Sequence, residues 1–299
     1  MGHEVGRGGG AERRPQRPAR PPAPRAGRSV PRDLLRLAPA LFATTLLFGG
    51  ALLGAVKQSV QPPLGGGPST WSLDSWRAVV EDPTFRDALW FSIRLAVISS
   101  LVAALIALVL ATLLRSRSAA VKTTFSLPLT VPHLIVAVLA VAWLAPGGIA
   151  DRALGSLPIP VVHAESGLGI VLVYVYKETP FLVLLLLSVM GRTLRQREEA
   201  TSVLGASPPQ VLRWVVWPAV RRPLMIGSMI VGAFVLGAFE VPLVLGPNYP
   251  PTLATYAYQA TQASALSGQG KAAASLLVAA AAAVALGLGA MALARAEDD

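Results

Sequence analysis

The sequence contains no cysteine and little charge. The absence of cysteine among its 299 residues excludes disulfide bonds, cysteine-ligated zinc and thiol catalysis. Its three histidines, at positions 3, 133 and 163, have no metal-ligand spacing. Charged residues make up 14% of the chain, whereas hydrophobic residues make up 53% and the mean hydropathy is +0.56. This composition is too apolar for an ordinary soluble domain and indicates an integral membrane protein.

A nucleotide-binding motif is also missing. No glycine-rich loop ends in Gly-Lys-Ser or Gly-Lys-Thr, so we expect this chain not to hydrolyse ATP. No set of nucleophile, base and acid can be assembled either, so a membrane-embedded enzyme is the least supported functional hypothesis. We therefore predict no catalytic residues, no metal site and no cofactor.

Long hydrophobic runs dominate the sequence. A membrane-spanning helix needs about 20 mostly apolar residues. Six runs meet this requirement, at 37–56, 88–114, 123–146, 167–190, 224–246 and 272–294. The predicted fold class is therefore all-α, a polytopic membrane protein with six transmembrane helices in residues 33–299. Residues 1–32 are rich in Arg, Pro and Gly and cannot bury a core, so we expect a disordered tail.

The distribution of basic residues predicts the orientation of these spans. Nineteen of the 26 lysines and arginines lie in the two terminal tails and in loops 115–122 and 191–222, and five lie in the loops of the opposite side. Basic loops face the cytoplasm, so both termini and both of these loops are predicted to be cytoplasmic. No aromatic residues are interleaved with the charges for base stacking, so the net charge of +10 indicates a lipid bilayer and no nucleic acid.

The segment between the fourth and fifth spans reads "EEATSVLGASPPQVLRWVVWPAVRRP" at 198–223. Its first seven residues favour a helix, and Gly205 breaks that helix. Ser207 can cap a second helix with Pro208 at its first position, and Pro218 is expected to end or kink it. Taken alone, the segment has two interpretations: a shaped docking surface, or an interfacial amphipathic helix without a partner.

This segment resembles the cytoplasmic signature loop of permeases of bacterial binding-protein-dependent ABC importers. That signature runs Glu-Ala-Ala, three residues, Gly, about nine residues, an aliphatic residue and then Pro. The run at 127–143, "LPLTVPHLIVAVLAVAW", also resembles the third helix of the family. The five-helix core of the family would therefore correspond to spans two to six. The matching signature residues are Glu199, Ala200, Thr201 (usually Ala), Gly205, Ala206, Val215 and Pro218.

The resemblance implies a permease subunit in the bacterial cell membrane that forms the translocation path for a small solute. It implies that a separate cytosolic ABC ATPase docks on the coupling loop, residues 191–222. It also implies an extracytoplasmic solute-binding protein and a second permease, identical or homologous, because the signature occurs once here and ABC transporters use two docking sites. The string at 238–258 resembles the polyamine, ferric iron, thiamine and phosphonate branch of the family, so we expect a solute of one of these kinds.

Ionisable residues inside the spans are candidates for the translocation path, because a charge in the membrane is costly unless it is paired or hydrated. Glu240 is predicted near the middle of the fifth span, where it faces a cationic or polar solute or pairs with Lys177 or Arg94. Lys177 and Glu178 point about 100° apart on a helix, and structural pairing is the preferred interpretation of Lys177. Arg94 is expected to snorkel outward. An alternative function is a secondary transporter driven by protons through Glu178 or Glu240, although the chain has no duplicated half.

Overall fold

The structure, a computed structural model, describes residues 2, 30–61, 71–155, 159–263 and 268–295. The described residues form helices and no strands, which confirms the predicted all-α class. The predicted tail at 1–32 lies almost entirely outside the described residues. Within the described ranges, six helical segments are long and apolar enough to cross a membrane: Leu37–Ser59, Pro83–Leu114, His133–Leu154, Leu168–Val189, Pro208–Gly237 and Gly268–Arg295.

The chain divides into two compact units at Gly50. The first unit contains α1 (Val30–Thr44) and the π-helical turn η1 (Thr45–Gly49). Its described side chains are exposed and apolar, as expected for a helix that faces lipid. The second unit holds the helices from α2 (Gly50–Ser59) onward and contains the hydrophobic core.

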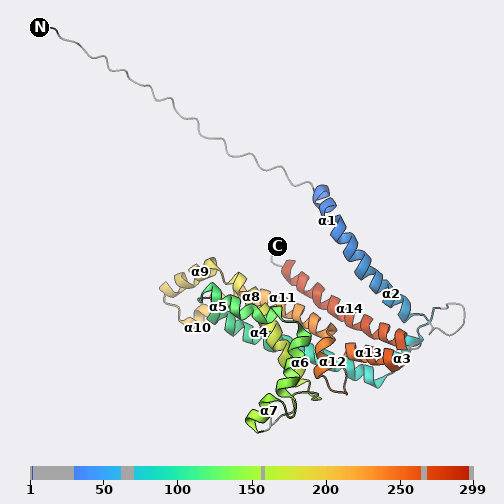
Figure 1. Ribbon diagram of the computed structural model, residues 1–299. Helices are drawn as coiled ribbons and strands as arrows, with labels where there is room; N and C mark the ends of the chain where they lie inside the picture. The colour runs from blue at the N-terminus through green and yellow to red at the C-terminus, as the bar shows by residue number, and fades with distance from the viewer. Residues whose placement is uncertain (1, 3–29, 62–70, 156–158, 264–267, 296–299) are drawn as a thin grey trace. The chain divides into compact units, whose positions relative to one another are not determined.

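The second unit is a helix bundle with short helices at each of its two ends (Figure 1). Helices α5, α9 and α10 lie at one end, and α3 and α13 lie at the other (Figure 1). The two internal basic loops therefore share one end, which agrees with their predicted location on one side of the membrane. The helices are α3 (Asp74–Val80), α4 (Pro83–Leu114), α5 (Ala119–Ser126), the 3-10 helix η2 (Leu127–Thr130), α6 (His133–Leu144), α7 (Ile149–Leu154), α8 (Leu168–Val189), α9 (Arg192–Val203), α10 (Pro208–Val211), the π-helical turn η3 (Leu212–Val216), α11 (Trp217–Gly237), α12 (Glu240–Leu245), α13 (Leu253–Ala263) and α14 (Gly268–Arg295).

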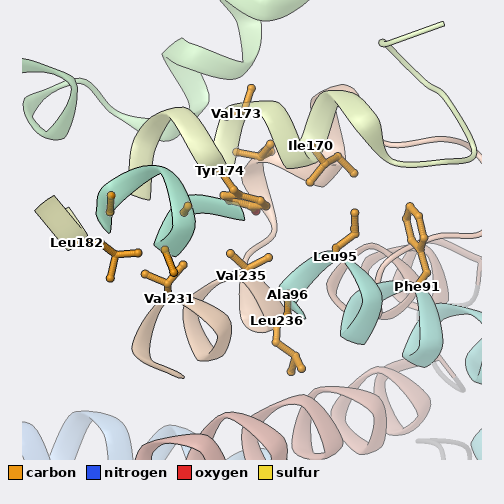
Figure 2. Packing of buried hydrophobic residues seen from close by; sticks show 14 of the residues in the cluster. Phe91, Leu95, Ala96, Ile170, Val173, Tyr174, Leu182, Val231, Val235 and Leu236 are labelled. Atoms are coloured by element: carbon orange, nitrogen blue, oxygen red, sulfur yellow. The ribbon is translucent and has the colours of Figure 1, made fainter. Parts of the chain in front are cut away.

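The core lies where α4, α8 and α11 pack together. Figure 2 shows side chains from the three helices pointing toward one another, with Tyr174 of α8 among them. The buried side of α4 is rich in alanine and serine, which lets the neighbouring backbones approach closely. Helix α14 packs on α11 and α13 through a similar alanine-rich surface. Small residues on α4 and α14 therefore allow close helix packing, as expected in a membrane where lipid tails are as apolar as the side chains.

Asp82 fixes the start of α4 and attaches it to α13. One carboxylate oxygen, Oδ1, accepts a hydrogen bond from the Thr84 amide at 2.9 Å, which caps the helix. The other, Oδ2, accepts one from the Tyr256 hydroxyl of α13 at 2.8 Å. Burial acts to raise the pKa of Asp82, but these hydrogen bonds, first that from Tyr256, hold it below its ordinary value of 3.8.

Two predicted spans are interrupted in the structure, and each interruption directly precedes or lies within four residues of a proline. The third span, predicted as 123–146, is divided at Val131, which is extended (ψ 128°) because the ring of Pro132 disfavours a helical residue before it. The fifth, predicted as 224–246, ends at Gly237 and resumes at Glu240. In a continuous helix the ring of Pro242 would clash with the carbonyl of Ala238, which is extended instead.

Two matched tyrosine substitutions test this account of the packing. The Tyr174 side chain is fully buried, and its hydroxyl has no hydrogen-bond partner among the described residues, so Tyr174→Phe should leave the apparent Tm unchanged or raise it. Tyr256→Phe removes the hydrogen bond to Asp82 and should lower stability by about 1–2 kcal/mol. Thermal unfolding of the purified protein in detergent compares the two variants.

The loss of stability in Tyr256→Phe should depend on pH in a defined direction. Since the folded pKa of Asp82 lies below 3.8, its stabilisation is present at neutral pH and is lost as the pH falls through that folded value. The difference between Tyr256→Phe and wild type should therefore shrink only in strong acid. A larger loss of Tm in Tyr174→Phe than in Tyr256→Phe would contradict this description.

Candidate coupling loop and translocation path

The coupling loop has the predicted helix–glycine–helix layout. Helix α9 ends at Val203, and Gly205 adopts a left-handed backbone conformation (φ +91°) that reverses the chain. Ser207 then caps α10: its amide donates to Gln210 Oε1 at 2.8 Å, and Pro208 occupies the first position of the helix. A Cβ atom at Gly205 would meet nothing within 4 Å. Glycine is therefore required here by the backbone conformation and not by space.

The sequence predicts that Pro218 ends or kinks the second helix, and the structure shows that the helix does not end there. Helical structure continues from Pro208 to Gly237, and Pro218 lies in the first turn of α11. The π-helical turn η3 (Leu212–Val216) directly precedes it. A π-helical turn changes the hydrogen-bond register, so the helix can absorb a proline that has no N–H and would clash with the carbonyl four residues earlier. The coupling loop is therefore continuous with the span that follows it.

Two contacts attach α9 to the end of α4. Glu198 Oε1 lies 2.5 Å from Arg115 Nη1, and 13% of the Glu198 side chain is exposed. Arg195 Nη2 donates to the Arg115 carbonyl at 3.4 Å. Sequence reasoning selected Glu199 from the signature and missed Glu198, because its partner lies 83 residues away in the chain. The two adjacent glutamates thus differ: the Glu198 carboxylate is engaged in an ion pair, whereas the Glu199 side chain is exposed and makes no polar contact with any described residue.

The signature residues line hollows on the coupling loop. Ala200, Thr201 and Pro218 line one hollow of about 530 Å³. The hydroxyl of Thr201, which stands where the family usually has Ala, donates to the Arg197 carbonyl at 2.7 Å, so the substitution leaves no donor unsatisfied. Glu199 and Ala206 line a second hollow of about 990 Å³ against the end of α4.

The tip of the coupling loop is apolar and strongly exposed. Val203 is 86% exposed and Leu204 is 87% exposed, although they are the last residue of the highly polar helix α9 and the residue that follows it. Large apolar side chains exposed beside polar ones are typical of a surface that contacts another protein. Trp214 and Leu212 of η3 add 62% and 49% exposed side chains to the same segment.

The structure gives Lys177 partners that the sequence did not predict. Its side chain is 2% exposed, and Nζ donates to the carbonyls of Pro128 and Val131, each at 2.5 Å. The Pro128 carbonyl belongs to η2, and the Val131 carbonyl belongs to the interruption between η2 and α6. The pairing of Glu240 with Lys177 or Arg94 is therefore not found, because the buried Lys177 ammonium and the Arg94 guanidinium donate their hydrogen bonds to backbone carbonyls.

The three remaining charged candidates lie in different surroundings. Glu178 Oε1 contacts His133 Nε2 at 3.0 Å, across the junction of α8 and α6. Glu240 starts α12, is exposed, and makes no hydrogen bond or ion pair with the described residues. It is therefore not in the middle of a continuous fifth span; it lies at a helix N-terminus, where the helix dipole favours a carboxylate.

Arg94 donates to the carbonyls of Glu165 and Ser166 at 3.2 and 3.3 Å, so its side chain reaches the loop before α8, as the snorkelling prediction requires.

Helix α6, which begins at His133, is largely exposed within the chain. Helix α12 packs against α6, and the His133 ring lies 5.0 Å from the ring of Phe234 at the end of α11. In α6, which is described throughout, Ala137 is the one buried residue, although the helix is apolar on all sides. A helix that is apolar all round is expected to be covered in its working environment.

The family of this chain follows from a comparison with known protein families. A model described as "Binding-protein-dependent transport system inner membrane component" matches residues 100–298, which include the coupling loop and both interrupted spans. The chain belongs to this family. The chain is therefore a multi-pass, inner-membrane permease component of a binding-protein-dependent ABC transport system. This confirms the family that the signature predicted.

Individual relatives agree with this assignment. The permease is 30% identical over 236 residues to the inner membrane ABC transporter permease protein YnjC of Escherichia coli K12, a match that covers 78% of this chain and 44% of YnjC. The chain thus spans less than half the length of that relative. It is 24% identical over 230 residues to PhnU of Salmonella paratyphi A, which is named as a permease of a 2-aminoethylphosphonate transport system, with 74% of this chain and 78% of PhnU covered.

Solved structures share the fold. A chain from the crystal structure of a bacterial alginate ABC transporter bound to its alginate-loaded periplasmic protein superposes with a TM-score of 0.67 over 87% of this chain and 95% of that chain, at 20% identity. A second structure of an ABC transporter that imports alginate gives a TM-score of 0.70 over 88% of this chain, at 18% identity. At these identities the likeness establishes the architecture of the permease alone.

The different surroundings of Glu198 and Glu199 lead to opposite expectations. Glu198→Ala removes the ion pair with Arg115, worth roughly 1 kcal/mol at this exposure, and should speed amide hydrogen exchange in residues 192–203. Glu199→Ala removes an unpartnered side chain and should leave exchange in the isolated permease unchanged. Equal exchange in both variants would show that the Arg115 contact does not hold α9.

Proposed function

We propose that the permease receives ATP-driven motion from a separate cytosolic ATPase through residues 198–218 of the coupling loop. The support is the exposed apolar tip at Val203 and Leu204, mounted on a polar helix that is attached to α4 by an ion pair. The absence of a nucleotide-binding motif in the sequence requires an external source of energy. In this proposal residues 33–299 form the permease domain, and the termini and the coupling loop face the cytoplasm.

The proposed assembly contains two permease units, two ATPase subunits and an extracytoplasmic binding protein that delivers the solute. The apolar surface of α6, with α12 beside it, supports a path shared with a second permease, because this surface is left uncovered within one chain. Alternating access would then follow from ATP-driven closure at the cytoplasmic end. One of the two alginate transporter structures is a complex with a periplasmic protein, which agrees with such a delivery route.

We propose a small solute with a cationic group, within the polyamine-, iron-, thiamine- or phosphonate-like classes. The named solute of PhnU, 2-aminoethylphosphonate, carries an amine as polyamines do. Glu240 is an exposed carboxylate beside the uncovered surface of α6 and α12, so it is available to a cation. Lys177 cannot oppose it, because its ammonium is bound by carbonyls in the protein interior.

A proton-driven secondary transporter is not favoured. The carboxylate of Glu178 is occupied by His133, and Glu240 has no neighbouring acid or histidine in hydrogen-bond contact among the described residues, so the two do not form a proton relay. The family assignment points to an external ATPase instead.

Substitutions at Gly205 test the coupling proposal. Gly205→Val puts a β-branched residue into a left-handed conformation and should distort the loop, whereas Gly205→Asn tolerates this conformation much better. We expect ATP-driven uptake by the reconstituted transporter to fall at least about tenfold in the valine variant and less than about threefold in the asparagine variant. Undiminished uptake with Gly205→Val in correctly inserted protein would refute a coupling role.

Glu240→Gln tests the solute proposal. The amide keeps the size of the side chain but removes its charge, so the affinity for a cationic solute in the path should fall and the KM for uptake should rise. Lys271→Gln, a charge change in a half-buried residue of α14, serves as the control and should leave KM unchanged. Uptake of the solute with equal KM and kcat in wild type and Glu240→Gln would remove Glu240 from the path.

A further inference from the structure

Two consecutive residues of α8 hold the two sides of one interruption in the third span. Lys177 donates two hydrogen bonds, at 2.5 Å each, to Pro128 and Val131 on the side of η2. Glu178 contacts His133, the first residue of α6, at 3.0 Å. Neighbouring side chains on a helix point about 100° apart, which lets one pair of residues reach both sides of the break.

The charges match the helix ends that they contact. An ammonium is stabilised by the carbonyls at the C-terminal end of a helix, where Lys177 lies against η2. A carboxylate is stabilised at an N-terminal end, where Glu178 lies against α6. A buried ammonium without hydrogen-bond partners would be strongly unfavourable, so the position of Lys177 and the shape of the break depend on each other.

The same helix leads directly to the coupling loop. Helix α8 ends at Val189, and α9 begins at Arg192 (Figure 1). Lys177 is twelve residues before the end of α8, about 18 Å along a helix axis. Pro180 lies between them but is buried in the bundle, where its neighbours hold it. A displacement of the coupling loop therefore acts on the helix that carries both contacts.

We propose that Lys177 and Glu178 are positioning residues that form a two-sided clamp and make α6 move with α8. Helix α6 has little other packing inside the chain, and α12, which carries Glu240, rests against it. The clamp would thus pass movement of the coupling loop to the surface that we assign to the translocation path. The inference rests on the proposed function but assigns to Lys177 a role in transmission and not in solute contact.

The first test measures ATP hydrolysis and solute uptake on the same proteoliposomes of the complete transporter. Lys177→Met keeps much of the side-chain volume and removes the ammonium. We expect hydrolysis within about twofold of wild type and a fall of at least about tenfold in solute transported per ATP. Glu178→Gln can still hydrogen-bond His133 and should keep most of the coupling, whereas Glu178→Ala should not. Lys271→Met is the matched control and should couple normally.

The second test reports on the clamp without any transport. The chain has no cysteine, so spin labels can be placed at two substituted positions alone, Leu139 on α6 and Leu184 on α8, both exposed. In the wild-type background the distance distribution should be narrow and should not change when nucleotide is trapped; with Lys177→Met it should broaden.

The outcomes distinguish a failure of the proposed function from a failure of the clamp. A wild-type complex without ATP-driven uptake would refute the proposed function, and the spin-label distances would still decide on the clamp. Normal transport per ATP in Lys177→Met, or an unchanged α6–α8 distance distribution in that variant, would overturn the clamp. A loss of assembly in Lys177→Met is recognised by size-exclusion chromatography, and the comparison then rests on Glu178→Ala against Glu178→Gln.

Discussion

The architecture of this permease depends on one constraint: a backbone that crosses a membrane must satisfy its hydrogen bonds within the protein. Several prolines lie inside or beside the spans, and at four of them the structure shows three ways of meeting that constraint. The helix absorbs Pro218 with a π-helical turn, divides before Pro132 and Pro242, and keeps Pro180 within buried α8. The divided helices leave backbone carbonyls that need partners, and Lys177, the most buried charged residue among those the structure describes, donates hydrogen bonds to two carbonyls at one break.

This constraint also explains how coupling and translocation are connected in one chain. The coupling loop is continuous with the fifth span on one side and joined to α8 on the other. Its ion pair from Glu198 to Arg115 adds a third attachment, to α4. These three helices, α4, α8 and α11, are the ones that form the core (Figure 2). A force on the loop therefore acts on the rigid part of the bundle, while α6 and α12 remain at its surface.

The sequence was informative wherever a signal is local. Hydrophobic run length predicted six spans, glycine and proline preferences predicted the layout from α9 to α10, and the signature motif predicted the family. The sequence misled where a proline permits more than one response, as at Pro218, and where a long run hides a break, as at Ala238. It could not reveal partners that are distant in the chain: Arg115 for Glu198, or the carbonyl of Val131 for Lys177. A charge inside a span predicts that a partner exists, but only packing decides which group it is.

The central claim is that the coupling loop is the contact through which a separate ATPase acts on the permease. The most direct test places a photo-crosslinking residue at Leu204, at the exposed tip of the loop, in the assembled transporter. The control is the same residue at Leu154, which is 72% exposed but lies in α7, away from the loop. The account predicts crosslinking to the ATPase subunit from position 204 and none from position 154. A tip that crosslinks only to lipid or to the permease itself would contradict it.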